Sequence, residues 1–256
     1  MNNLNDKTAL ICGATSGIGL AIAKNYIANG AQVIITGRRE SGEETASQIG
    51  AQFIRCDVTV ETAVEACFKE AEQRLGKLDV LVINAGIADE EGSIEAFSGE
   101  GMRSIVEVNL NGVFYALKYG PRHMNDGGSI INTGSVAGSG ITHAGTGVYA
   151  ATKAAGAYLA RTAAIENASR SIRVNSVCPA MIAGTGMMVD DDGSDDAKFL
   201  ATLTAFGRMG RQDEAVGIYN FLASDASTFI TGQEVRVDGG LSAGISLPIF
   251  SAIAGD

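Results

Sequence analysis

Tyr149 and Lys153 stand four residues apart in the segment GTGVYAATKAAG, where nearly every neighbour is Ala, Gly or Thr. The Ala-rich run that follows favours a helix, and residues four apart on a helix share one face. A free phenol has a pKa of about 10, too high for efficient general-base work at neutral pH, and a neighbouring ammonium favours the phenolate. The pair is therefore suited to moving a proton at an alcohol or carbonyl oxygen. The alternative is an incidental surface lysine beside a half-buried tyrosine.

Three glycines near the N-terminus form a second candidate site. Gly13, Gly17 and Gly19 lie in CGATSGIG, between an apolar run typical of a strand and a segment typical of a helix. Glycines at such a junction allow a tight turn, a close approach of the backbone to a pyrophosphate, and helix N-terminal amides that face an anion. The strand and helix context favours this reading over an ordinary glycine-rich turn.

The elements that must position these residues alternate along the chain. Short β-branched runs are separated by longer amphipathic segments, and the apolar runs are unbroken. This pattern predicts an α/β fold with a single Rossmann-type, doubly wound parallel sheet flanked by helices on both faces. Ligands in such sheets bind beyond the carboxyl ends of the strands. The predicted strands are residues 8–13, 32–37, 52–57, 78–86, 128–135, 171–179 and 233–240.

Composition narrows the class of protein. The chain has 256 residues, 46% hydrophobic and 19% charged, which fits one dinucleotide-binding and catalytic domain over residues 1–256. The formal net charge of −10 works against nucleic-acid binding. No apolar run reaches the roughly 18 residues of a membrane span, and no secretory signal is visible at the N-terminus. We therefore expect a cytoplasmic protein that binds neither nucleic acid nor membrane.

Cysteine and histidine usage predicts neither a metal site nor a disulfide framework. The four cysteines are scattered without a C-x-x-C motif, and the two histidines stand alone. Free thiols in a reducing compartment are the expected state. The cysteines are Cys12, Cys56, Cys67 and Cys178, and the histidines are His123 and His143.

Five motifs occur in an order that resembles the short-chain dehydrogenase/reductase family. They are Gly13-Ala-Thr-Ser-Gly17-Ile-Gly19, Asn84-Ala-Gly86, Asn109 in VNLNGVF, Ser135 in NTGSVAG, and Tyr149-x-x-x-Lys153. The resemblance continues through RVNSVCPA and FLASDASTFITGQEVRVDGG, so it covers nearly the whole chain.

The resemblance assigns roles to the site residues. It makes Tyr149 the acid/base and Lys153 its electrostatic partner, which also holds the nicotinamide ribose. Ser135 would bond the substrate oxygen, and Asn109 would position a water that relays protons to Lys153. Asp57 and Val58 would contact adenine, residues 84–86 would line its pocket, and Ile182 and Thr185 would hold the carboxamide. The implied cofactor-binding residues are Gly13, Thr15, Ser16, Gly17, Ile18, Gly19, Arg38, Asp57, Val58, Asn84, Ala85, Gly86, Tyr149, Lys153, Pro179, Ile182 and Thr185.

Three positions depart from the family pattern. Cys12 replaces the usual Thr before the first glycine, and Ala180 replaces the usual Gly after Pro179. The separation of Ser135 and Tyr149 is one residue longer than the common spacing, so we expect the loop between them to be distorted. None of these changes removes a reacting group.

The end of the second predicted strand bears on cofactor choice. Gly37 stands where NAD-preferring relatives carry an acidic residue, and Arg38 and Arg39 follow it. A carboxylate there binds a ribose 2′-hydroxyl, whereas a guanidinium binds a 2′-phosphate. Ser16 occupies a position where some NADP enzymes have a second basic residue. The sequence thus favours NADP with NAD possible, and a solvated arginine pair is the alternative.

Substrate identity is the least constrained feature. Residues 183–206 depart from the strand–helix pattern and are expected to form a lid with an adaptable lining from Met181, Met187 and Met188. His143 is a candidate for the pocket wall. The expected substrate is an apolar secondary alcohol or its ketone, cyclic compounds included. The predicted substrate residues are Ser135, His143, Tyr149 and Met187.

Two alternative functions stay open. A 3-oxoacyl-thioester reductase would bind an anionic carrier, which the acidic stretch DDDGSDD disfavours. A regulator that senses a dinucleotide without turnover is the alternative from another class. Such proteins typically lose the tyrosine or the lysine, and this chain retains both.

The C-terminal tail, residues 245–256, extends past the last predicted strand. Its side chains are too apolar for a free tail in water, and Pro248 discourages a regular helix through them. Relatives with this layout are commonly homotetramers, so we expect a homotetramer in which the tail packs across a subunit interface. Packing on its own subunit is the alternative. The apolar side chains are Ile245, Leu247, Ile249, Phe250 and Ile253.

Overall fold

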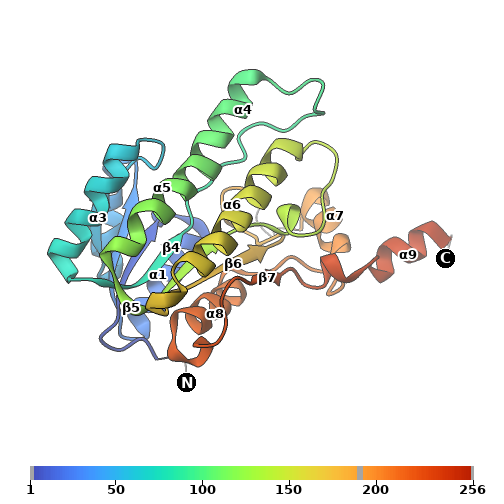
Figure 1. Ribbon diagram of the computed structural model, residues 1–256. Helices are drawn as coiled ribbons and strands as arrows, with labels where there is room; N and C mark the ends of the chain where they lie inside the picture. The colour runs from blue at the N-terminus through green and yellow to red at the C-terminus, as the bar shows by residue number, and fades with distance from the viewer. Residues whose placement is uncertain (1–2, 189–192, 255–256) are drawn as a thin grey trace.

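The computed structural model describes residues 3–188 and 193–254, which form a parallel sheet covered on both faces (Figure 1). The strand order is β3-β2-β1-β4-β5-β6-β7, and every pairing is parallel. The predicted doubly wound fold is confirmed. The strands are β1 (Thr8–Cys12), β2 (Gln32–Gly37), β3 (Gln52–Arg55), β4 (Leu78–Ile83), β5 (Met124–Thr133), β6 (Arg173–Pro179) and β7 (Glu234–Val237).

Helices lie on both faces because the strands are apolar on both. Alternate residues of β1 show this: Leu10 packs into a core with α3, α5 and α6, while Ile11 packs into a core with α1, α2 and α8. Burying both faces is what unbroken apolar strands require. The helices are α1 (Gly17–Ala28), α2 (Gly42–Ile49), α3 (Glu61–Leu75), α4 (Gly99–Val106), α5 (Gly112–Tyr119), α6 (Gly147–Glu166), α7 (Asp195–Leu203), α8 (Gln212–Ala223) and α9 (Leu247–Ala254).

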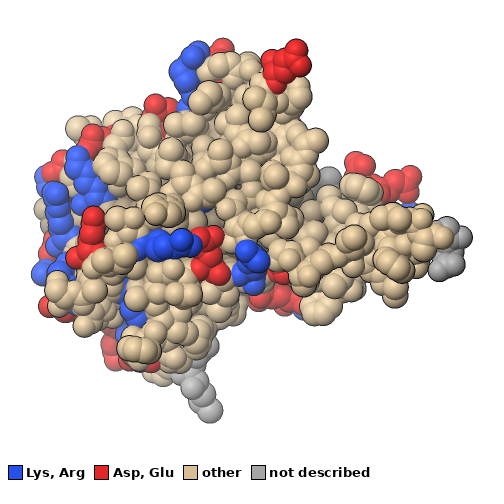
Figure 2. Space-filling model, turned by 45° about the vertical axis from the view of Figure 1, so that its right-hand side comes forward, with Lys and Arg blue, Asp and Glu red and all other residues tan. Residues whose placement is uncertain are grey.

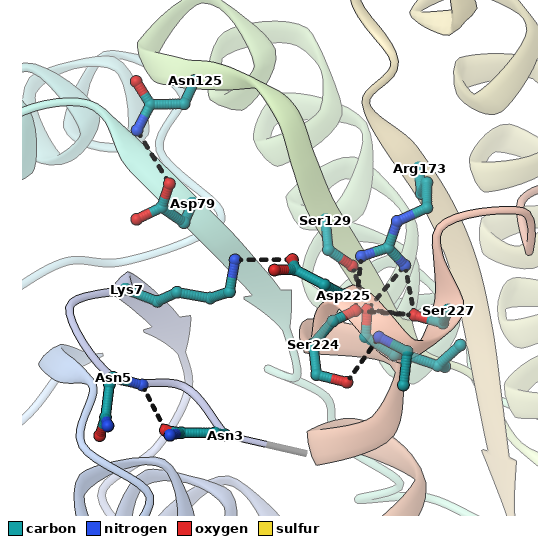
Figure 3. A network of polar contacts seen from close by, with 12 residues as sticks. Asn3, Asn5, Lys7, Asp79, Asn125, Ser129, Arg173, Ser224, Asp225 and Ser227 are labelled. Carbon is teal, nitrogen blue, oxygen red and sulfur yellow. Dashed lines mark hydrogen bonds and ion pairs between the residues drawn. The ribbon is translucent and has the colours of Figure 1, made fainter. Parts of the chain in front are cut away.

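A buried arginine joins α8 to the sheet (Figure 3). Arg173, at the start of β6, donates hydrogen bonds to the Leu222 carbonyl (2.8 Å), the Ser227 hydroxyl (2.7 Å) and the Ser224 carbonyl (3.3 Å). The Ser129 hydroxyl of β5 also donates to the Leu222 carbonyl, at 2.8 Å. The carbonyl groups at the end of α8 thus find partners without water.

Replacing Arg173 by Met is expected to lower the free energy of unfolding by about 1–3 kcal/mol, because three buried oxygens each lose one hydrogen bond from a charged donor. Urea unfolding followed by circular dichroism measures this. The matched control is Arg161→Met, which removes a half-exposed ion pair with Glu234 and should cost no more than about 1 kcal/mol. Equal losses in the two variants would contradict this account of Arg173.

The expectation that Pro248 prevents a helix in the tail is wrong. Pro248 is the second residue of α9, where its missing N–H is not needed and its fixed φ suits the helix. Ser246 before the helix is buried and donates a hydrogen bond to the Thr202 carbonyl of α7. Figures 1 and 2 show α9 projecting from the body of the molecule, and the surface it presents in Figure 2 has no charged side chain.

The lid expected over residues 183–206 contains a regular helix, α7, in its described part. Ser194 begins this helix by accepting a hydrogen bond from the Ala197 amide, and Asp195 and Asp196 are exposed in its first turn. Residues 189–192 of the acidic stretch lie outside the described residues. Acidic side chains suit the first turn of a helix, because the amides there carry partial positive charge.

Candidate active site

A cleft of about 1,160 Å³ lies beyond the carboxyl ends of the central strands. Pockets for one small ligand measure about 300–1,000 Å³, so this cleft has room for an extended ligand or for two. Of the residues predicted to act in catalysis or to bind cofactor or substrate, three do not line it: Gly19 and Asp57, which were predicted to bind cofactor, and Asn109, which was predicted to be catalytic. Those that line it are Gly13, Thr15, Ser16, Gly17, Ile18, Arg38, Val58, Asn84, Ala85, Gly86, Ser135, His143, Tyr149, Lys153, Pro179, Ile182, Thr185 and Met187.

The glycine turn after β1 leaves no room for side chains. A Cβ on Gly13 would lie 2.6 Å from the Ala85 Cα, and one on Gly19 would lie 2.4 Å from the Gly13 carbonyl oxygen. Gly13 and Gly17 also have positive φ angles, 76° and 56°. Gly19 is thus a packing residue behind the turn, which explains its absence from the cleft wall.

The start of α1 is suited to an anion. Ser16 is the N-cap residue, and its side chain makes no capping hydrogen bond to the first turn. The free amides of that turn lie at the cleft wall beside Gly17 and Ile18. Free N-terminal amides and the helix dipole together attract phosphate. The tight glycines and these amides fit the pyrophosphate of a dinucleotide.

Tyr149 and Lys153 lie on the first two turns of α6, as their spacing predicts. Lys153 is 6% exposed, and its ammonium donates a hydrogen bond to the Thr133 carbonyl at 2.9 Å. The Lys153 Nζ lies 5.7 Å from the centroid of the Tyr149 ring. A Cβ on Gly86 would lie 3.1 Å from this Nζ, so a larger residue there would press on the ammonium. The two side chains thus share one wall of the cleft, as the predicted proton-transfer pair requires.

Asn109 holds the loop after β4 from behind the cleft. It lies in a π-helical turn, Glu107–Asn111, which joins α4 to α5. Its side-chain amide donates to the Ile87 carbonyl at 2.9 Å, and its oxygen accepts from the Ile87 amide at 2.8 Å. Asn109 therefore positions the backbone next to Gly86 and Lys153. The predicted water relay stays a prediction.

The loop between Ser135 and Tyr149 changes direction at glycines. The Ser135 hydroxyl accepts a hydrogen bond from the Ala137 amide and starts a 3₁₀ turn, Val136–Gly138. Beyond it, Gly140 and Gly145 have positive φ angles of 128° and 94°. The Gly145 carbonyl accepts from the Gly92 amide at 3.0 Å, which joins the two loops that flank the cleft.

The turn after β2 presents basic side chains to the cleft. A Cβ on Gly37 would lie 2.7 Å from the Thr15 Cγ2, so there is no space for an acidic side chain at this position. Arg38 and Arg39 line the cleft, and within the described residues their guanidinium groups make no hydrogen bond or ion pair. Arg55 fixes the turn by donating to the Arg38 carbonyl at 2.9 Å.

Asp57 serves the turn after β3 in this structure. Its carboxylate accepts hydrogen bonds from the Thr59 amide at 3.0 Å and the Thr59 hydroxyl at 2.8 Å. The neighbouring Val58 lines the cleft. An adenine contact of Asp57 thus stays a prediction.

The opposite end of the cleft is apolar. Sequence reasoning identified Met187 and His143, and both line the cleft with exposed side chains. It missed the apolar face of α7, although the apolar spacing at 199, 200 and 203 is a helical signal. The further apolar lining residues at this end are Ile141, Met181, Met188, Phe199, Leu200, Leu203 and Leu241.

No group of three or more His, Cys, Asp or Glu side chains in residues 3–188 and 193–254 is arranged to hold a metal ion. Within the same residues, every helix is too short or too polar to cross a membrane.

Known proteins match this chain over most of its length. A family model described as enoyl-(acyl carrier protein) reductase matches residues 13–242. The chain is 36% identical over 252 residues to the NADP-dependent (R)-specific alcohol dehydrogenase of Lentilactobacillus kefiri, covering 94% of this chain and 99% of that protein. It is 36% identical over 245 residues to the cis-4-hydroxycyclohexanecarboxylate dehydrogenase of Sinomonas cyclohexanicum, covering 93% and 97%. A solved short-chain type dehydrogenase/reductase from Mycobacterium ulcerans has a TM-score of 0.90 at 31% identity, covering 98% of this chain and 94% of that one.

Proposed function

The chain belongs to the short-chain dehydrogenase/reductase family, whose members are NAD(P)-dependent oxidoreductases, and we propose that it interconverts an apolar secondary alcohol and its ketone. One observation carries this proposal: the buried Lys153 ammonium lies 5.7 Å from the Tyr149 ring in a cleft that also holds Ser135. The family relation and this geometry support it together.

When bound, the nicotinamide dinucleotide supplies or accepts the hydride at the carbinol carbon. Ser135 and Tyr149 then hold the substrate oxygen, and Tyr149 donates a proton to the carbonyl during reduction or removes it during oxidation. Lys153 stabilises the phenolate form of Tyr149 with its charge. Asn109 keeps the loop that carries Gly86 against Lys153, so that the ammonium stays in place.

NADP is the proposed preferred cofactor, with NAD as a weaker one. Support comes from Arg38 and Arg39 after β2, whose guanidinium groups have no partner among the described residues, and from the close contact that a side chain at Gly37 would make with Thr15. The Lentilactobacillus relative is described as NADP-dependent.

Replacing Arg38 by Ala is expected to weaken NADP binding about 10- to 100-fold, because a charge-assisted hydrogen bond is worth about 1.5–3 kcal/mol. NAD binding should change less than about twofold, because NAD lacks the phosphate. Fluorescence titration with both cofactors measures this, with Arg103→Ala on α4 as a control away from the cleft. An equal loss of affinity for NAD and NADP would show that Arg38 is structural.

The apolar lining and the named relatives support an alcohol or ketone without charged groups, cyclic compounds included. A 3-oxoacyl-thioester substrate is disfavoured because its carrier is anionic. The described lining of the cleft includes the acidic residues Glu90, Glu91 and Asp196, and of its basic residues Arg38 and Arg39 lie at the cofactor end and Lys153 lies beside Tyr149. The family model is described as an enoyl-(acyl carrier protein) reductase, and that substrate is disfavoured for the same reason, because acyl carrier proteins are anionic.

A screen of ketones and secondary alcohols with both cofactors tests the function. The absorbance of the reduced nicotinamide should change fastest with neutral apolar compounds and NADP or NADPH. Turnover confined to acyl thioesters would support the thioester alternative. Cofactor binding without turnover of any compound would support the sensing regulator.

A homotetramer is proposed, with the apolar face of α9 packed against a neighbouring subunit. Among the described residues nothing covers this face, since Leu247, Phe250 and Ile253 are 59–74% exposed, and Ile245 just before the helix is 68% exposed. Fully burying one such side chain is worth about 1.5–3 kcal/mol.

Truncation after Gly244 is expected to dissociate the assembly or to raise the Michaelis constant for substrate. Light scattering and steady-state kinetics measure the two effects. Ile94→Ser, which removes an 84% exposed side chain in a loop, controls for a general loss of apolar surface. An unchanged tetramer with an unchanged Michaelis constant would show that the tail has neither role.

The cytoplasm is the proposed compartment. All four cysteines lie in the described part of the chain, and all are buried and free. Free thiols suit a reducing compartment.

A further inference from the structure

Three of the four cysteines meet beneath the cofactor end of the cleft. Cys12 ends β1, Cys56 follows β3, and Cys67 lies in α3. All three line a cavity of about 10 Å³ whose other walls are mainly apolar. A cavity this small holds about one water at most, so the three side chains are packed closely together.

Cys56 differs from its two neighbours in its proton affinity. The neighbouring Cys67 side chain lowers the pKa of Cys56, and the pKa of Cys67 is raised in turn by Cys56 and by burial. Burial raises the pKa of Cys12 to about 12. Because the thiolate is the reactive form, these directions support Cys56 as the nucleophile of the group, with Cys67 as its neighbour in the small cavity.

Cys56 is also the member of the group that lines both the small cavity and the main cleft. It lies there beside Arg38 and Val58, at the end proposed for the adenosine part of the dinucleotide. Its amide donates to the Gly37 carbonyl at 3.0 Å, so Cys56 is fixed to the turn that carries Arg38. A small solute reaches Cys56 through the cleft, and a bound dinucleotide covers that route.

We propose that Cys56 and Cys67 are a reversible modification site, which a hydroperoxide oxidises to a disulfide and which bound dinucleotide protects. The protection by bound dinucleotide rests on the proposed function, whereas the oxidation of Cys56 and Cys67 to a disulfide does not. In the first step the Cys56 sulfur attacks the terminal peroxide oxygen, the O–O bond breaks, and the alcohol or water formed takes up a proton.

The second step leaves the chain oxidised by two electrons. The Cys67 sulfur attacks the Cys56 sulfenic acid, an S–S bond forms, the S–O bond breaks, and water leaves with the Cys67 proton. An S–S bond of about 2.05 Å is much shorter than the distance between two thiols in van der Waals contact. The disulfide therefore draws Cys56 towards α3 and shifts Val58 and the turn at Gly37, which weakens dinucleotide binding.

The experiment treats the full chain with hydrogen peroxide, blocks remaining thiols with N-ethylmaleimide, and maps disulfides by mass spectrometry of peptides. We expect a Cys56–Cys67 disulfide that dithiothreitol reverses and a loss of NADP affinity after oxidation. NADP at ten times its Kd should slow the reaction about tenfold, since it leaves about one site in eleven free.

Two variants separate this pair from general oxidation. Cys67→Ala should form no disulfide and should accumulate a sulfenic acid at Cys56 that dimedone traps. Cys178→Ala, at a buried cysteine outside the cavity, should still form the disulfide.

The urea-unfolded chain is treated with the same peroxide to show that the reagent oxidises its thiols. The proposal is overturned if the unfolded chain is fully oxidised but the folded chain forms no Cys56–Cys67 disulfide. An NADP titration of the reduced protein is run in parallel. If NADP binds there but oxidation proceeds at the same rate, the protection is refuted, while failure of NADP to bind counts against the proposed function alone.

Discussion

Tyr149→Phe is expected to lower kcat for ketone reduction by about 10²- to 10⁴-fold, the usual contribution of a general acid or base. Phenylalanine keeps the ring that packs beside Lys153 but has no proton to transfer. Because the glycine turn and Arg38 are unchanged, the Kd for NADP should stay within about twofold. Stopped-flow absorbance measures the first quantity and fluorescence titration the second.

The matched control is Tyr158→Phe, which removes a hydroxyl from an exposed side chain on the same helix and should leave kcat unchanged. Near-normal turnover in Tyr149→Phe would refute the proposed acid/base role. It would then favour either another proton donor or a protein that senses cofactor.

Lys153→Met is expected to reduce kcat by about 10²-fold or more, because the phenolate of Tyr149 loses its neighbouring charge. The Michaelis constant for the dinucleotide should also rise, since Lys153 is proposed to hold the nicotinamide ribose. Methionine has a similar length, so the packing against Gly86 and Gly138 is retained. Steady-state kinetics with varied cofactor and substrate separates the two effects.

Lys24→Met, on the exposed face of α1, controls for the removal of one positive charge. A thermal unfolding curve of Lys153→Met is also needed, because the variant leaves the Thr133 carbonyl without its donor. Loss of kcat in a folded variant with unchanged cofactor binding would limit Lys153 to the electrostatic role. Unchanged kcat would contradict the electrostatic role, and an unchanged Michaelis constant for the dinucleotide would contradict the ribose contact.

The sheet was predictable because its strands are buried on both faces. Runs such as Leu78–Ile83 are apolar at nearly every position, which is typical of central parallel strands. The position of the cleft followed from this, since ligands bind beyond the carboxyl ends of such strands. The pairing of Tyr149 with Lys153 needed only the spacing of a helix.

The features that the sequence did not reveal depend on contacts between distant segments. The π-helical turn at Asn109 has no local signature, and its purpose becomes visible only through the two hydrogen bonds to Ile87. Gly19 was predicted to bind cofactor, and the structure gives a packing reason for a glycine there, because a Cβ would lie 2.4 Å from the Gly13 carbonyl oxygen. Pro248 was treated as a helix breaker although it stands in the first turn of α9.

Transfer of deuterium from the cofactor to the substrate tests the central proposal most directly. The protein is mixed with NADPH labelled with deuterium at the C4 position that donates the hydride and with the best ketone from the screen. Mass spectrometry then locates the label in the alcohol. The proposed function predicts one deuterium on the carbinol carbon with the wild-type chain and almost none with Tyr149→Phe over the same time. An alcohol that carries no deuterium, or no alcohol from any ketone although NADPH binds, would contradict it.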